Sequence, residues 1–152
     1  MRRSCLSLLA VLLAVGCSRP VSSQALGFEY EPPSGVKLSS EEPGPPAVAR
    51  FEGGVEVRSV PGTPPALEAL PEAVLGAAGV SVPGKRVSTS QGTLPAGPVA
   101  RYEFQEGTHR TLVYFLPRPD RFLLFTFTAP ERDYGPRSAK VELSLSTLKL
   151  LR

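Results

Sequence analysis

Residues 111–128 read TLVYFLPRPDRFLLFTFT, two apolar runs joined by a link that contains two prolines. Residues 112–116 and 122–125 are apolar at consecutive positions. Since successive side chains of a strand point to opposite faces, each strand must be covered on both sides. The link has turn chemistry, with Pro119 at the second turn position and Asp120 at the third. The sequence therefore predicts an antiparallel hairpin that is buried on both faces.

The segments on either side of this hairpin suggest what surrounds it. Residues 99–104, VARYEF, alternate between apolar and polar side chains and predict a further strand. Val141, Leu145 and Leu148 recur at helical spacing and predict a helix over about residues 136–150. An antiparallel pair buried on both sides calls for helices above and below it. We therefore expect an α+β fold in which helices cover both faces of an antiparallel sheet.

The first half of the chain is rich in proline and glycine and predicts shorter elements. Residues 26–30 alternate as a strand, and residues 48–58 read as a hairpin around Gly53 and Gly54. Residues 39–46 contain three prolines and predict a loop. Apolar spacing between residues 65 and 79 predicts a helix that Pro71 must start, kink or shorten.

This order of elements resembles a known family. The opening LGFEYEPPSG of residues 26–35 and the Ala129-Pro130-Glu131 step are local echoes of the PsbP-like proteins. That family includes photosystem extrinsic subunits and small bacterial lipoproteins. The resemblance implies an α/β/α sandwich over residues 26–151 and binding or assembly work rather than catalysis, with no shared active site.

The N-terminus resembles a bacterial lipoprotein signal. Arg2 and Arg3 precede an apolar run over residues 6–15, and the run ends in LAVGC at Cys17. At about 1.5 Å per helical residue the run reaches only about half of a roughly 30 Å hydrocarbon core, so it matches a secretory signal and not a membrane span. The resemblance implies lipidation of Cys17 and cleavage before it. An ordinary signal with a coincidental cysteine is the alternative.

Processing changes the charge and the cysteine content. The whole chain has 17 basic and 14 acidic residues, and removal of Arg2 and Arg3 leaves 15 basic residues. This near balance does not support a nucleic-acid partner. Cys5 is lost with the signal and Cys17 is acylated, so the mature domain is expected to have no free thiol for a disulfide, a metal site or catalysis. We predict no cofactor.

Four arginines near strand ends and the hairpin link form a candidate partner surface: Arg101, Arg110, Arg118 and Arg121. Guanidinium groups suit phosphate headgroups or an acidic partner, although an ordinary solvated surface also explains them. Seven aromatic residues between 102 and 127 suggest either a core or a pocket for an apolar ligand, and core packing is the favoured interpretation.

Candidate catalytic groups are sparse. His109 is the single histidine and is expected to be an exposed strand-end residue. Ser146 and Lys149 fit a Ser-x-x-Lys pattern but lack its companion motifs. Glu29 and Glu31 share one side of a predicted strand, which suits either acid-base work or a solvated face. These residues do not assemble an acid, a base and a nucleophile, so we expect no enzyme.

The sequence thus predicts three parts: a signal peptide over residues 1–16, a flexible tether over 17–25 and one domain over 26–152. We expect a non-catalytic binding or assembly domain in the periplasm, anchored through Cys17. Ser18 does not carry an inner-membrane retention signal, which favours the outer membrane. A carrier of an apolar ligand and a hydrolase are the alternative functions.

Overall fold

The computed structural model describes residues 19–152, so the predictions for the signal peptide and Cys17 lie outside the described residues. The strands are β1 Val21–Ser23, β2 Phe28–Tyr30, β3 Leu38–Glu42, β4 Ala47–Phe51, β5 Val55–Pro61, β6 Lys85–Leu94, β7 Gly97–Glu106, β8 His109–Pro117, β9 Arg121–Pro130 and β10 Lys149–Leu150. The helices are α1 Pro71–Ala77, α2 Glu131–Ser144 and the short 3-10 helix η1 Leu145–Thr147.

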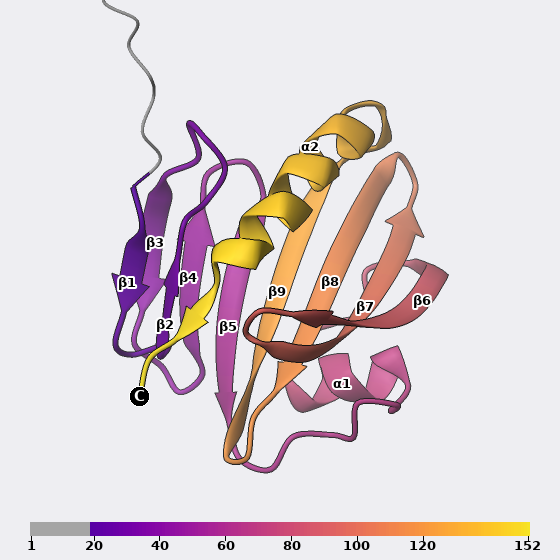
Figure 1. The fold of residues 1–152 in the computed structure, drawn as a ribbon. Coiled ribbons are helices and arrows are strands. Elements are labelled where there is room, and N and C mark those ends of the chain that lie inside the picture. The colour runs from indigo at the N-terminus through magenta and orange to yellow at the C-terminus, as the bar shows by residue number, and fades with distance from the viewer. Residues whose placement is uncertain (1–18) are drawn as a thin grey trace, which may run out of the picture.

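Seven strands form one antiparallel sheet in the order β3-β4-β5-β9-β8-β7-β6 (Figure 1). The β8–β9 hairpin has the predicted pairing, with Leu116 opposite Leu123. Its turn is closed by the Arg118 N–H, which donates to the Arg121 carbonyl at 2.8 Å. A second sheet has three strands in the order β1-β2-β10, so the two ends of the described chain meet in it.

The predicted hairpin around Gly53 and Gly54 joins β4 and β5. Both glycines have positive φ, 79° and 86°, which L-residues with side chains rarely adopt. Gly54 also packs against β9, because a Cβ there would lie 2.3 Å from the Thr128 carbonyl oxygen. Glycine is required here by both the turn and the close approach of β9.

One face of the large sheet is covered by α2 and by the three-stranded sheet (Figure 1). Phe28 and Tyr30 of β2 pack over β4, β5 and β9, and the Tyr30 ring lies edge-on to Phe51 and Phe125. Val141 of α2 and Leu145 of η1 belong to the same cluster of buried side chains. The β-rich N-terminus thus covers part of a face that the sequence assigned to helices.

A helix covers only part of the other face. The prediction of helices over both faces of the sheet is therefore wrong. The seven-residue α1 places Val74 and Leu75 against β7, β8 and β9. Beyond that region, β4 and β5 carry Arg50, Glu56 and Arg58, which form ion pairs at 2.9–3.2 Å. The molecule is mainly antiparallel sheet because a second sheet, together with α2, covers the apolar face of the large sheet.

Several boundaries also differ from the predictions. β3 occupies residues 38–42, part of the expected loop, because an edge strand that is exposed along its length shows no apolar alternation. β1 lies within residues 17–25, the expected tether, and pairs with β2. β6 carries almost no apolar signal, since its side chains are largely exposed.

The C-terminal helix begins and ends earlier than predicted. Pro136 lies inside α2 rather than at its start, and Ser144 is the last α-helical residue. Leu148 after η1 is extended, with φ −61° and ψ 122°, and turns the chain into β10. Pairing of β10 with β2 therefore ends a helix that local spacing alone would continue.

Candidate functional site

The four predicted arginines form two groups rather than one surface. Arg101 of β7 and Arg110 of β8 both lie near Glu103, at 2.6 and 3.9 Å. Arg121 lies at the β8–β9 turn with Arg118, and its guanidinium donates to the Leu26 and Gly27 carbonyl oxygens at 3.2 and 3.4 Å. Arg121 therefore holds the start of β2 against the large sheet.

The first group belongs to a polar network between β7, β8 and α2. Arg101 donates to Glu142 of α2 at 2.5 Å, and the Tyr114 hydroxyl donates to the same carboxylate oxygen at 2.7 Å. The Tyr134 hydroxyl of α2 donates to Glu103 at 2.8 Å. The carboxylates balance the arginine charges, so the network attaches α2 to the sheet and offers little net charge to a partner.

These contacts shift the pKa values of Glu103 and Tyr114 in the network. Burial by itself raises the pKa of Glu103, but the hydrogen bonds from Arg101 and Tyr134 outweigh it and hold that pKa below its usual value. Burial and the bond to Glu142 raise the pKa of Tyr114 to about 12. At neutral pH the network therefore consists of a carboxylate acceptor and phenol donors.

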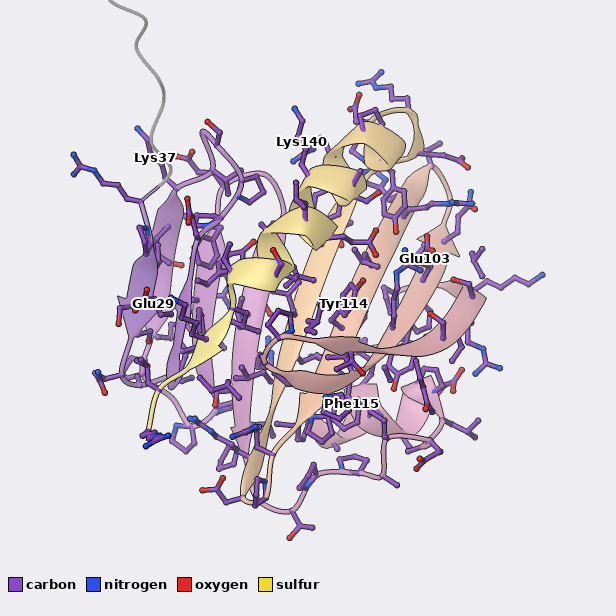
Figure 2. All side chains as sticks on the ribbon, viewed as in Figure 1. Glu29, Lys37, Glu103, Tyr114, Phe115 and Lys140 are labelled. Atoms are coloured by element: carbon purple, nitrogen blue, oxygen red, sulfur yellow. The ribbon has the colours of Figure 1, made fainter. Side chains whose placement is uncertain are left out.

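The aromatic side chains pack the two cores, which confirms the favoured interpretation. Phe104, Phe115 and Phe122 are buried with α1, whereas Phe125 and Phe127 are buried on the α2 face. Figure 2 labels the neighbours Tyr114 and Phe115, whose side chains leave β8 on opposite faces. The aromatic residues thus fill space between elements, and the largest of them are fully buried.

The candidate catalytic residues are separated. His109 is exposed at the start of β8, as predicted, with its Nδ1 atom 3.5 Å from the Thr108 hydroxyl. Ser146 lies in η1 and donates to the Leu143 carbonyl at 2.7 Å, whereas Lys149 lies in β10. Among residues 19–152, no three histidine, cysteine or acidic side chains form a group that suits a metal ion.

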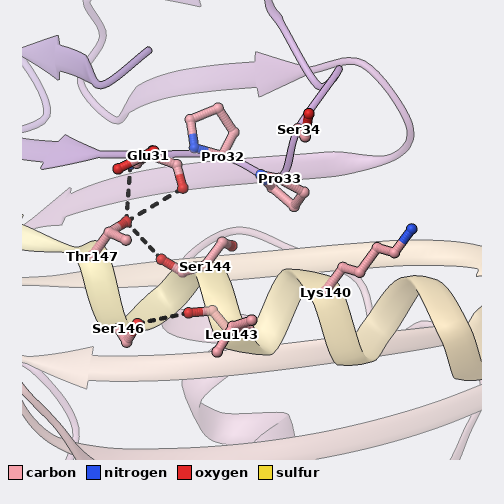
Figure 3. Close-up of a pocket in the computed structure, with 9 residues that line it drawn as sticks. All are labelled: Glu31, Pro32, Pro33, Ser34, Lys140, Leu143, Ser144, Ser146 and Thr147. Carbon is pink, nitrogen blue, oxygen red and sulfur yellow. Dashed lines mark hydrogen bonds between the residues drawn. The ribbon is translucent and has the colours of Figure 1, made fainter. Parts of the chain in front are cut away.

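A surface cavity lies where the turn after β2 meets the end of α2 (Figure 3). Its volume is about 390 Å³. The lining residues are Glu31, Pro32, Pro33, Ser34, Lys140, Leu143, Ser144, Ser146 and Thr147. The proline pair is part of the opening motif of residues 26–35, but the sequence did not indicate that α2 would come against it.

Hydroxyl groups build this cavity by joining the two walls. The Tyr30 hydroxyl lies 2.6 Å from the Ser144 hydroxyl, and burial raises the pKa of Tyr30 to about 12. The Thr147 hydroxyl accepts a hydrogen bond from the Glu31 N–H at 3.0 Å and lies 2.6 Å from the Ser144 carbonyl oxygen (Figure 3). The Tyr30–Ser144 and Glu31–Thr147 contacts join residues more than 100 positions apart, so only the tertiary fold creates the cavity.

Leu143 is a highly exposed apolar side chain in the cavity wall. It is 75% exposed, the most exposed large apolar side chain of the described residues. Pro33 provides a second apolar surface, and Lys140, Ser34 and Ser146 surround the two with polar groups. An apolar centre with a polar rim is the usual composition of a protein-binding surface.

Two solved structures share the fold. A protein from Bacteroides thetaiotaomicron VPI-5482 aligns with a TM-score of 0.59 at 16% identity, over 89% of this chain and 49% of its own, so the chain spans about half of that protein. Cyanobacterial PsbP (CyanoP) from Synechocystis sp. PCC 6803 aligns with a TM-score of 0.56 at 12% identity, over 93% of this chain and 98% of its own. The chain has a PsbP-like fold. No protein-family model and no curated protein sequence matches it.

The PsbP-like fold was predicted correctly from the order of the elements, whereas the prediction of helices on both faces of the sheet was wrong. Within the described part of the chain, no helix is long and apolar enough to cross a membrane.

Proposed function

We propose that this PsbP-like domain is the binding part of a bacterial lipoprotein, held on the periplasmic side of the outer membrane through Cys17. The domain acts by binding another envelope protein and does not catalyse a reaction. The lipobox-like sequence ending at Cys17 supports the anchor. The exposed Leu143 beside the cavity supports the binding role and is the observation on which that role rests.

The expected partner presents an apolar side chain to the space between Leu143 and Pro33. Exposing a leucine to water is unfavourable by about 25 cal/mol per Å² of apolar surface, and a partner that covers it recovers this free energy. Lys140 and the Ser34 hydroxyl supply donors around that contact, and the Ser146 hydroxyl, which donates to the Leu143 carbonyl, supplies an acceptor. The proposed occupant is therefore a protein segment with an apolar anchor and polar flanks.

Photocrosslinking in intact cells tests the binding role. A photoreactive amino acid at position 143 should produce a discrete protein adduct. The matched control is position 70, because Leu70 is 65% exposed but lies next to α1 and away from the cavity. Equal labelling at both positions, or none at position 143, would contradict the binding role. Intact mass of the same protein tests the anchor, and an unmodified Cys17 would exclude it.

A further inference from the structure

The distance between the proposed anchor and the first strand is short. Cys17 precedes Val21, the first residue of β1, by four positions. Four residues span at most about 14 Å when fully extended. β1 is not a free segment, because Val21 and Ser23 pair with Tyr30 and Phe28 of β2. A lipid on Cys17 would therefore hold the folded domain against the bilayer surface rather than at a distance from it.

The surface next to β1 is formed by the turn of residues 32–37. This turn, Arg19 and Val21 line a cavity of about 410 Å³. On its other side the same turn lines the Leu143 cavity and a smaller cavity of about 170 Å³ against α2. We call the surface around these three cavities the turn face. Arg19 and Val21 line one of its cavities, so the turn face includes the start of β1.

The turn face carries an excess of positive charge. Its cations are Arg19, Lys37, Arg137 and Lys140. Its carboxylates are Glu31 and Glu52. Arg137 is held by the Gly53 carbonyl and the Phe127 ring. Among the described residues, Arg19, Lys37 and Lys140 form no ion pair with an acidic side chain, and Figure 2 shows Lys37 and Lys140 projecting from the same edge of the molecule.

We propose that the turn face docks on anionic phospholipid headgroups of the membrane in which Cys17 is anchored. The inference rests on the proposed anchor and adds an orientation to it. Lysine and arginine side chains near an anionic bilayer are attracted to it over about one Debye length, roughly 10 Å at 0.1 M salt. A connection of at most about 14 Å from Cys17 lets the turn face come within that distance. The Leu143 cavity is one of the three cavities of this face, so the partner proposed above would be met at the bilayer surface.

The test measures which part of the domain approaches the headgroups. The mature lipidated protein is reconstituted in vesicles that contain nickel-chelating lipid, with a spin label introduced by S34C in the turn. A label introduced by E68C near α1 is the control position. On vesicles with phosphatidylglycerol, the label at residue 34 should relax faster than the label at residue 68. On neutral phosphatidylcholine vesicles the difference should diminish.

Charge reversal separates attraction by the turn face from attraction by total charge. K37E/K140E should lower the docked fraction, because each cation contributes on the order of fivefold to the docking equilibrium. K85E/K149E changes net charge equally, but neither lysine lines the three cavities, and it should leave the relaxation unchanged. Equal relaxation at residues 34 and 68, or an equal effect of the two double variants, would overturn the orientation.

Intact mass of each reconstituted sample distinguishes this inference from the proposed function. An unmodified Cys17 would overturn both, because no lipid would then hold the domain at the bilayer. A lipidated chain in which residue 34 stays as far from the headgroups as residue 68 would overturn the docking of the turn face alone.

Discussion

The two faces of the large sheet are built from the same strands but are stabilised in different ways. The face toward α1 is apolar where it is covered, with Phe104, Val113 and Phe115 fully buried. The face toward α2 combines an apolar cluster with the network of Arg101, Glu103 and Glu142. Apolar packing is non-directional, whereas hydrogen bonds fix position and angle. The network therefore orients α2, which carries the Leu143 side of the cavity.

The largest effect is expected on the apolar face. Phe115→Ala removes a ring that is fully buried and lies edge-on to Phe122, with centroids 5.3 Å apart. We expect a loss of about 3–5 kcal/mol in the free energy of unfolding, measured by chemical denaturation. Tyr114→Phe on the other face of the same strand is the control and should cost only about 0.5–1.5 kcal/mol, since it removes one hydrogen bond. Similar losses in both variants would mean that the faces do not differ as described.

A smaller effect is expected in the network. Glu103→Gln removes the charge that Arg101 and Arg110 face, and we expect a loss of about 1–3 kcal/mol at pH 7. Because the pKa of Glu103 is lowered in the folded state, its contribution is present above its unfolded pKa, near the usual value of 4.5, and is lost as the pH falls through the folded value. The difference between the wild type and Glu103→Gln should therefore shrink in denaturation experiments below about pH 4.5. A difference that is constant from pH 7 to pH 3 would contradict this assignment.

The smallest effect is expected at Tyr102, on the face toward α1. Its side chain is 1% exposed, and its hydroxyl has no hydrogen-bond partner among the described residues. Tyr102→Phe removes this unpaired group and should leave stability unchanged or raise it by up to about 1 kcal/mol. Thermal unfolding at pH 7 measures the change. Destabilisation by more than about 1 kcal/mol would show that the hydroxyl has a partner and that this face is not purely apolar.

Sequence patterns predicted the two hairpins of the large sheet, but they predicted neither the Leu143 cavity nor the arrangement of the arginines. The β4–β5 and β8–β9 hairpins were predicted correctly, because Gly53-Gly54 and Pro119-Asp120 act on neighbouring residues. β3 and β6 were missed because strands with exposed side chains have no apolar alternation to detect. The arginines were expected to form one surface, but two of them face Glu103 and Glu142, and Arg121 binds backbone carbonyl groups.

Local sequence is sufficient for the turns and for the alternation of the buried strands, since each depends on residues that are close along the chain. The second sheet, the pairing of β5 with β9 and the cavity depend on residues far apart. Tyr30 meets Ser144 and Glu31 meets Thr147 only after α2 has packed on the sheet and β10 has paired with β2. Burial of the apolar face that these elements share brings them together, and a local pattern shows that such a face exists but not which segment covers it.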